Sequence, residues 1–284
     1  MNTTLPAPIV VGVDGSPCSD LALDWAIEEA RLRRAPLRLV YVVDSPGPRG
    51  AYGYLTDEVT TFGDDLLAGA RELAAARQVP ATTAIVCDDA AHGLIREAKE
   101  AALLAVGSRG HGGFHDLLLG STSLQTAMHA TCPVAVIRPR TAPDPDEGRR
   151  IVLGVDGSPR SAAAARVAFE LASLHGIGLT VLHAWVGSLS EATAGLDTRD
   201  ALEVRARMVL NDALAPWLSR YPEVDVRKLV LKQTAARALV EASAGAETVV
   251  VGCRGRGGFA SLMLGSVSHA LVHHAGCPVV VVHE

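Results

Sequence analysis

The sequence predicts an α/β fold that contains two tandem domains, each built on a five-stranded parallel sheet. Short continuous apolar runs alternate with longer segments of helical periodicity, as is typical of parallel strands covered by helices on both faces. The pattern occurs twice: Gly154 follows Gly12 by 142 residues, and Gly252 follows Gly107 by 145 residues. The length of 284 residues also suits two domains of ordinary size, each able to bury its own core.

The first strand and helix carry the clearest pattern. Residues 8–14 (Pro-Ile-Val-Val-Gly-Val-Asp) form an apolar run that ends in the carboxylate of Asp14, which predicts a strand buried on both faces. Residues 15–17 (Gly-Ser-Pro) predict a turn. Residues 18–34 carry apolar side chains at roughly helical spacing, and Ser16 or Ser19 is placed to cap the helix.

The rest of the first half continues this alternation. Residues 44–54 are rich in Pro and Gly, so we expect an irregular loop there. We expect further strands at residues 36–43, 82–87, 103–106 and 132–137, and further helices at residues 56–77, 90–101 and 121–129.

A proline-rich, charged segment at residues 138–150 separates the two halves and indicates an exposed linker. After it, residues 154–159 repeat the Gly-Val-Asp-Gly-Ser-Pro sequence of residues 12–17, and residues 277–279 repeat the Cys-Pro-Val of residues 132–134. We therefore expect a first domain at residues 1–140, a linker at 141–149 and a second domain at 150–284.

Composition excludes several classes of protein. Apolar residues make up 49% and charged residues 20% of the chain, which indicates a globular protein rather than a disordered one. The formal net charge of -5 argues against a nucleic-acid partner. Because no apolar run is long enough to span a bilayer and the N-terminus lacks the pattern of a signal peptide, we expect a cytoplasmic protein without a membrane partner. The five cysteines are scattered, so neither a disulfide framework nor a zinc site is indicated.

Two glycine-rich stretches carry the strongest functional signal. Residues 107–121 and 252–266 both read Gly, two residues, Gly, nine residues, Gly-Ser, and each follows an apolar run. Glycines at this spacing allow positive φ and close approach to a ligand, with successive N–H groups turned toward an anion such as a phosphate chain. Ser121 stands where a helix N-cap is expected, which would add further donors. The alternative is an ordinary flexible turn.

Charged side chains near these stretches are candidates for ligand contact. In a doubly wound sheet the ligand lies beyond the carboxyl ends of the strands, where the strand order reverses, so one crevice can hold Asp14 and the first glycine stretch. Asp14 and Asp156 are candidates to position a divalent ion such as Mg²⁺, with a helix cap or a ribose acceptor as the alternative roles. Arg109 and Arg254 are candidates to neutralise phosphate charge, with solvation or pairing across the domain interface as the alternative.

Together, Gly-Val-Asp-Gly-Ser, the glycine motif and Cys-Pro-Val resemble the ATP-binding universal stress protein family, in the tandem form that is common in actinobacteria. The resemblance covers both halves of the chain. It implies a Rossmann-like, adenine nucleotide alpha hydrolase-like fold with strand order 3-2-1-4-5, and ATP held between the first strand and the glycine motif.

Carried over by position, this resemblance implies one nucleotide site in each half. The backbone of Val42 would recognise adenine in the first half, and Ala184 holds that place in the second. The implied residues are Gly12, Asp14, Val42, Gly107, Arg109, Gly110, Gly113, Gly120, Ser121 and Thr122 in the first site, and Gly154, Asp156, Ala184, Gly252, Arg254, Gly255, Gly258, Gly265, Ser266 and Val267 in the second. Because Cys253 replaces Ser108 and Ala184-Trp185 replaces Val42-Val43, equal affinity is not expected.

The sequence favours a nucleotide holder over an enzyme. The chain contains no Gly-x4-Gly-Lys-Ser/Thr motif, and backbone N–H groups that stabilise ground and transition states alike do not raise a chemical rate. We expect an ATP-dependent stress-response regulator with at most slow hydrolysis, which forms a homodimer and acts on an unidentified regulatory protein. The alternatives are an adenine-nucleotide α-hydrolase, whose usual Ser-Gly-Gly-x-Asp-Ser loop the chain lacks, and a scaffold with vestigial pockets.

Histidine and cysteine give weaker signals. His111 and His115 lie in the first glycine stretch, but Arg256 and Ala260 occupy the equivalent positions of the second, which excludes a role essential to both sites. We interpret His129 and the pair at 273–274 as surface or core residues. Cys253 beside a helix N-terminus suggests either a redox-sensitive thiol or, more simply, a buried and inert one.

Overall fold

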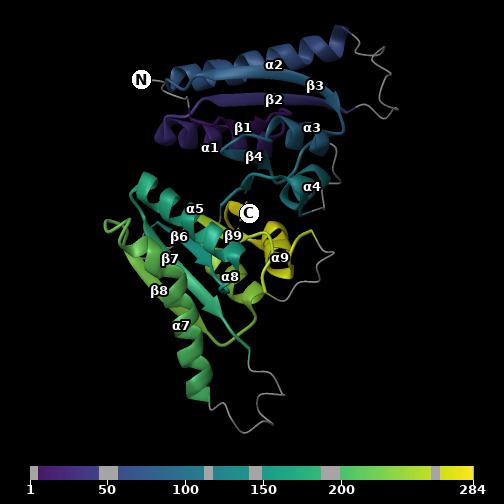
Figure 1. Cartoon of the computed structure of the whole chain (residues 1–284). Helices are drawn as coiled ribbons and strands as arrows, with labels where there is room; N and C mark the ends of the chain where they lie inside the picture. The colour runs from purple at the N-terminus through teal and green to yellow at the C-terminus, as the bar shows by residue number, and fades with distance from the viewer. Residues whose placement is uncertain are drawn as a thin grey trace. The chain divides into compact units, whose positions relative to one another are not determined.

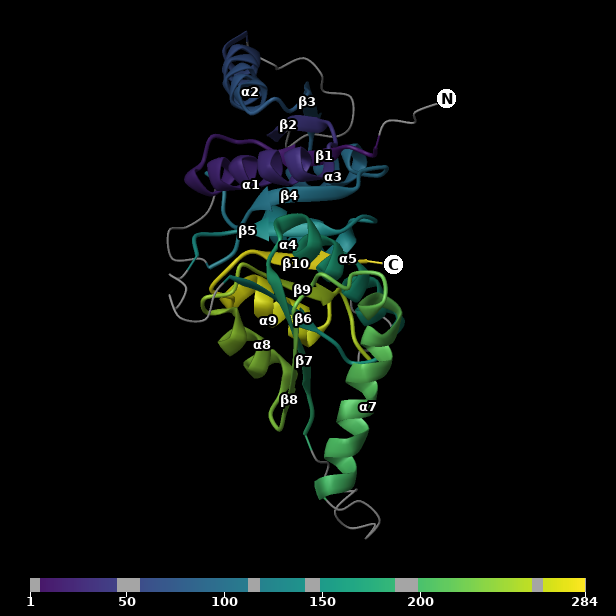
Figure 2. The ribbon, with the colours of Figure 1, turned by 90° about the vertical axis from the view of Figure 1, so that its left-hand side faces the viewer.

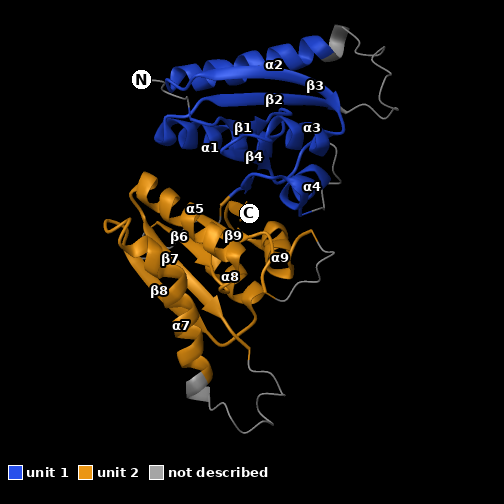
Figure 3. Cartoon of the chain, viewed as in Figure 1, with its two compact units in different colours: residues 1–139 blue, residues 140–284 orange. Residues whose placement is uncertain are grey.

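The structure is a computed structural model that describes residues 6–44, 57–111, 118–140, 149–186, 199–256 and 263–283. The chain divides into two compact units, Met1–Pro139 and Arg140–Glu284 (Figure 3). Most of the loop expected at residues 44–54 and all but the last residue of the linker expected at 141–149 lie outside the described residues.

Unit 1 alternates strands and helices as the apolar runs and periodic segments predict (Figure 1). Its elements are β1 Ile9–Gly12, α1 Pro17–Arg33, β2 Leu37–Asp44, α2 Asp57–Ala76, β3 Ala81–Asp88, α3 Ala90–Glu97, β4 Leu103–Gly107, α4 Ser121–His129 and β5 Val134–Ile137.

The strands of unit 1 form a parallel sheet in the order β3-β2-β1-β4-β5, which confirms the expected order 3-2-1-4-5. Helices α1 and α2 pack on one face, where Arg77 after α2 forms a 2.8 Å ion pair with Asp24 of α1. Helices α3 and α4 pack against each other on the opposite face. The strand order therefore reverses between β1 and β4, and the carboxyl ends of these two strands lie at the same edge.

Unit 2 repeats the architecture with its own elements. These are β6 Arg150–Gly154, α5 Pro159–His175, β7 Gly178–Ala184, α7 Arg199–Leu218, β8 Val226–Leu231, α8 Ala235–Ser243, β9 Thr248–Gly252, α9 Ser266–His274 and β10 Val279–Val282. The parallel order within the unit is β8-β7-β6-β9-β10. Helices α5 and α7 cover one face and α8 and α9 the other (Figure 2).

Strands whose side chains are apolar on both faces form much of the core of each unit. Every residue of β5 and of β10 is buried, as are all residues of β4 and β9 except the glycine that ends each strand. Full burial on both faces explains why these strands appear in the sequence as continuous valine- and leucine-rich runs rather than as alternating patterns.

The first helix of each unit begins at a capping serine. The side chain of Ser16 accepts a hydrogen bond from the N–H of Ser19, and Ser158 does the same for Ser161. Gly15 and Gly157, just before the caps, have φ of +78° and +77°. Only glycine takes this conformation without strain, so the Gly-Ser-Pro sequence fixes both the turn and the helix start.

Three sequence expectations were wrong in detail. Gly120 and Gly265, not the serines that follow them, are the N-caps of α4 and α9, because each glycine has extended backbone angles and each serine is already helical. Helix α3 ends at Glu97 rather than at residue 101. Among the described glycines of the two glycine stretches, none has positive φ.

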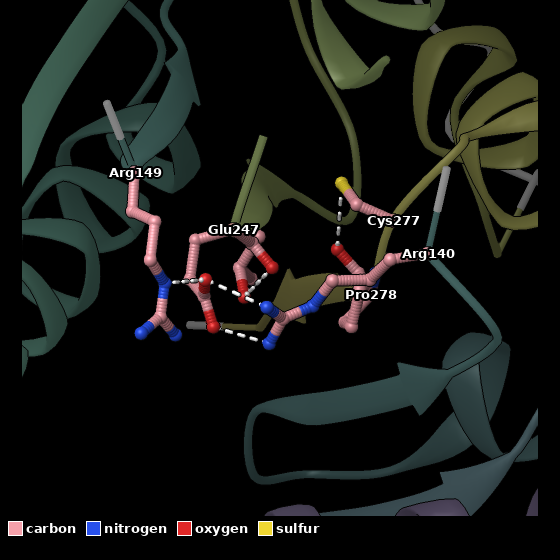
Figure 4. Close-up of polar contacts among 6 residues, drawn as sticks. Arg140, Arg149, Glu247, Cys277 and Pro278 are labelled. Atoms are coloured by element: carbon pink, nitrogen blue, oxygen red, sulfur yellow. Dashed lines mark hydrogen bonds and ion pairs between the residues drawn. The ribbon is translucent and has the colours of Figure 1, made fainter. Parts of the chain in front are cut away.

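A cluster of charged side chains holds both flanks of residues 141–148 to unit 2. Glu247, which precedes β9 and is 5% exposed, accepts hydrogen bonds from the guanidinium groups of Arg140 and Arg149, each at 2.7 Å (Figure 4). Burial disfavours the charged form of Glu247, but the hydrogen bonds and charges of Arg149 and Arg140 outweigh it and lower the pKa of this carboxyl.

The described helices include none that is both long and apolar enough to cross a membrane. All five cysteines are free, and four of them, including Cys253, are buried. Burial raises the pKa of the Cys132 thiol to about 11, so this thiol stays protonated at neutral pH.

Candidate functional site

Each unit carries a candidate site at the edge where its two central strands end. Site 1 lies between the segment after β1, with Asp14 and Ser16, and the segment after β4, with Arg109 and Gly110. Site 2 is the equivalent in unit 2, with Asp156, Ser158, Arg254, Gly255 and Arg256. The reversal of strand order leaves this edge uncovered by crossover connections, which is why ligands bind there in sheets of this kind.

In site 1, the turn after β1 is fixed by its own polar groups. One carboxylate oxygen of Asp14 accepts a hydrogen bond from the N–H of Ser16 at 2.9 Å, and the N–H of Asp14 donates to the hydroxyl of Ser19 at 3.0 Å. The hydroxyl of Ser16 donates to the carbonyl of Arg109 at 3.2 Å. The turn therefore binds directly to the glycine segment across the site.

Two glycines of the first motif lie where an added Cβ would meet other atoms at short distance. A Cβ at Gly107 would lie 2.6–2.8 Å from backbone atoms of Cys18 and Ser19 at the start of α1. A Cβ at Gly110 would overlap the second carboxylate oxygen of Asp14. Missing side chains, rather than unusual backbone angles, thus bring the backbone of the loop against the aspartate.

Helix α4 is tied to the end of β4. The N–H of Gly120 donates to the carbonyl of Ser108 at 2.8 Å, and the hydroxyl of Ser123 donates to the carbonyl of Gly107 at 2.7 Å. Ser121 is exposed and Thr122 is half-buried, both in the first turn of α4. The positive end of the helix dipole is thereby fixed close to the glycine segment, where it favours an anion.

The backbone of Val42 faces the space beyond the end of β1. The last paired residue of β1, Gly12, lies opposite Val40, and the N–H of Val13 donates to the carbonyl of Val40 at 2.9 Å. In a parallel strand, alternate residues direct their peptide groups toward the same neighbouring strand. Val42 therefore directs its N–H and C=O groups to the same side as Val40, but beyond the point where β1 ends. Ala184 stands in the same relation to Leu182 and β6 in unit 2.

Site 2 has the same frame but a different set of contacts to its aspartate. The carboxylate of Asp156 accepts hydrogen bonds from the N–H of Ser158 at 2.9 Å and from the N–H of Arg256 at 2.8 Å. A Cβ at Gly255 would overlap this carboxylate, and one at Gly252 would lie 2.9 Å from the backbone of Arg160 in α5. The guanidinium of Arg256 donates to the carbonyl of Gly157 at 2.7 Å.

These hydrogen bonds determine the charge state of Asp156. Burial disfavours its ionised form, but hydrogen bonds from Ser158, Arg256 and Ser161 outweigh burial and lower the pKa of the carboxyl. Asp156 is therefore a carboxylate at neutral pH.

In site 2, the segments at the ends of β9 and β7 carry residues that differ from their equivalents in site 1. The N–H of Gly265 and the hydroxyl of Ser268 both donate to the carbonyl of Cys253 at 2.7 Å. A ring nitrogen of His183 lies 2.8 Å from the carbonyl of Val155. Trp185, which follows Ala184, has the ammonium of Lys232 at 5.5 Å from its ring centroid.

The structure groups most, but not all, of the expected site residues. Gly12 and Gly154 lie against the side chains of Leu94 and Leu239 at packing contacts. Ser266 and Val267 occupy the first turn of α9, as Ser121 and Thr122 do in α4. Gly113 and Gly258 lie outside the described residues.

Sequence reasoning missed two kinds of contact. Ser19, Ser123 and Ser268 bond to backbone groups of the site segments, and the sequence analysis did not assign them this role. The double contact of Arg256 was also missed, although the repeat showed that Arg256 takes the place of His111. Within the described part of the chain, no three His, Cys, Asp or Glu side chains cluster as a metal site.

Comparisons with known proteins agree with the two-unit architecture. The model described as the universal stress protein family matches residues 7–138 and again residues 148–283. A universal stress protein of Mycobacterium tuberculosis is 38% identical over 291 residues, covering 97% of each chain. Another from the same organism is 37% identical over 288 residues, covering 97% of this chain and 96% of the relative.

The crystal structure of a universal stress protein from Archaeoglobus fulgidus superposes with a TM-score of 0.72 and covers 99% of this chain and 97% of its own. Its sequence identity is 18%, so this likeness concerns the fold alone. With two family matches and relatives aligned over almost their whole length, the chain belongs to the universal stress protein family and carries one family domain in each unit.

Proposed function

We propose that the protein binds one ATP in each unit and acts as a nucleotide-dependent stress-response regulator. One observation carries this proposal: in both units, glycine backbone at the switch point of the sheet lies directly against a half-buried aspartate that follows the first strand. A helix N-terminus is hydrogen-bonded to the adjoining strand end. This combination suits a phosphate chain, because backbone N–H groups and the helix dipole both favour negative charge.

The two ends of the nucleotide have separate supports in this proposal. The peptide groups of Val42 and Ala184 face open strand edges and are suited to the hydrogen-bonding edge of adenine. Arg109 is exposed and Arg254 half-buried in the segments that follow β4 and β9, within the part of each unit where the phosphates would lie. Asp14 and Asp156 would accept from a ribose hydroxyl or contribute one oxygen to a Mg²⁺ ion bound to the phosphates.

The proposed activity is retention of ATP with at most slow hydrolysis. The sequence has no P-loop lysine to neutralise charge on the terminal phosphates. Backbone N–H donors bind the phosphates of the substrate and of the transition state equally well. Such donors keep ATP bound without raising the rate of its hydrolysis. We propose that occupancy controls association, with a second copy of the chain and with a regulatory protein. Light scattering with and without ATP measures the first of these associations.

Equilibrium dialysis of purified protein against ATP tests the proposal. We expect saturable binding of two equivalents. We expect Gly110→Ala and Gly255→Ala each to weaken one site about tenfold or more, because the added methyl would overlap the facing aspartate. Gly69→Ala in α2 is the matched control, since its Cβ would have open space. Absence of binding at millimolar ATP, or equal binding by all three variants, would contradict the proposal.

A further inference from the structure

The two sites differ in the residue that follows their second motif glycine. Arg256 in unit 2 and His111 in unit 1 are equivalent in the repeat, and both lie over the turn after the first strand. The Arg256 side chain rests on Gly157, where a Cβ would overlap the guanidinium. In unit 1, a Cβ at Gly15 would lie 3.7 Å from the ring of His111.

Arg256 is bound to the turn through two groups. Its N–H donates to Asp156 at 2.8 Å, and its guanidinium donates to the carbonyl of Gly157 at 2.7 Å. The first bond fixes the backbone beside the aspartate. The second uses only part of the guanidinium, which carries five donors and a permanent charge. The side chain is exposed, so its remaining donors are accessible from solvent.

The strand order places Arg256 at one end of the site. In the order β7-β6-β9, Ala184 ends the first strand, Asp156 follows the second, and Arg256 follows the third. A nucleotide with its base beside Ala184 would extend its phosphate chain toward the loop after β9, which is the side of the site on which Arg256 lies.

The exchange of partners is favourable. The guanidinium now donates to one neutral carbonyl, whereas a phosphate carries the opposite charge and can accept two parallel hydrogen bonds from the same guanidinium. Arg256 therefore gains by leaving the carbonyl of Gly157 for a phosphate within its reach. The histidine of site 1 has neither the permanent charge nor the forked donors for the same exchange.

We infer that Arg256 determines specificity in site 2: it exchanges the Gly157 carbonyl for the terminal phosphate and makes this site favour nucleoside triphosphates over monophosphates more strongly than site 1. This inference rests on the proposed binding of ATP. It makes the sites unequal in a defined way, since site 2 would discriminate ATP from AMP more strongly than site 1 does.

A reciprocal swap tests the inference by calorimetric titration with ATP and with AMP. Site 2 is measured alone in a Gly110→Val background, which blocks site 1, and site 1 alone in a Gly255→Val background. We expect Arg256→His to weaken ATP binding at site 2 about tenfold and AMP binding less than about twofold. We expect His111→Arg to increase the ATP preference of site 1 by a similar factor.

Two further variants separate the effect of the Arg256 charge from a general effect of replacing an exposed arginine. Arg256→Gln keeps much of the side-chain length and the backbone contact but removes the charge, and it should reproduce Arg256→His. Arg237→His removes an exposed arginine on α8, where Arg237 pairs with Glu241, and should change neither titration. The same substitutions in the otherwise wild-type chain provide a second reading if a valine background fails to fold.

The outcomes distinguish the two proposals. If neither single-site background nor the wild-type chain binds ATP, the proposed function fails and the inference fails with it. If ATP binds but Arg256→His changes ATP and AMP affinity equally, or changes neither, the role of Arg256 is overturned while ATP binding stands.

Discussion

Gly107 shows how a single missing side chain holds a site in place. A Cβ at this position would lie 2.6–2.8 Å from backbone atoms at the start of α1, and backbone cannot move aside as a flexible side chain can. We expect Gly107→Ala to lower the free energy of unfolding by about 1–3 kcal/mol, as is usual for overpacking. Urea denaturation measures the change. Gly69→Ala, with open space at its Cβ, is the control, and equal stability of the two variants would refute the steric argument.

Residue roles were only partly predictable. Asp14 and Asp156 were identified because a carboxylate that ends an apolar run is conspicuous, and the structure places both at the switch point. The contact of Arg256 with Gly157 depends on where a long side chain folds back, which no spacing rule specifies. Glu247 was missed for the same reason, since its two arginines are 107 and 98 residues away in sequence.

At the scale of elements, the capping serines determine where α1 and α5 begin. Ser158 is 8% exposed, and its hydroxyl accepts from the N–H of Ser161 at 3.2 Å. We expect Ser158→Ala to cost about 1 kcal/mol in the free energy of unfolding, because that buried N–H loses its partner. Ser266→Ala is the control: Ser266 is exposed and already helical, so the substitution should have almost no effect in chemical denaturation. A larger loss of unfolding free energy for Ser266→Ala than for Ser158→Ala would indicate that Ser266, not Gly265, caps α9.

Elements were predicted well where one physical signal dominates. Fully buried strands gave continuous apolar runs, and Gly-Ser-Pro marked the turn before α1, whose cap is Ser16, one of the two serines expected. The range expected for α4 was correct, but its N-cap was assigned to Ser121 instead of Gly120, because either residue of a Gly-Ser pair can precede a helix and backbone angles decide between them. The end of α3 was misplaced because residues 98–101 contain no helix breaker. The chain turns there so that Ala98 is fully buried and the N–H of Ala102 reaches the carbonyl of Pro8.

At the scale of the whole molecule, the duplication and the strand order followed from the repeat and from the family resemblance. The charged cluster at Glu247 did not, although it fixes both flanks of residues 141–148 to unit 2 (Figure 4). The cluster contributes to stability in a pH-dependent way. Because the folded-state pKa of Glu247 is lowered, its contribution is present above the ordinary glutamate pKa of 4.5 and is lost as pH falls through the lowered value.

We expect Glu247→Gln to reduce the free energy of unfolding by about 1–3 kcal/mol at pH 7, since two arginines lose a buried partner but remain partly solvated. The difference between wild type and variant should shrink as pH falls below 4.5. Thermal or urea unfolding from pH 7 to pH 3 measures it. Glu241→Gln, in an exposed pair with Arg237, is the control. A difference that is constant with pH would contradict the assignment.

Trp185 gives unit 2 a spectroscopic property that unit 1 lacks. It directly follows Ala184, whereas Trp25 lies within α1 and Trp217 of α7 stacks on Phe169 of α5. An adenine ring seated at the end of β7 would quench or shift the indole emission of Trp185 and displace the nearby Lys232. We therefore expect intrinsic fluorescence to follow filling of the second domain without any label, and Trp185→Phe to abolish the signal. The chain thus contains its own optical probe for one of two otherwise similar domains.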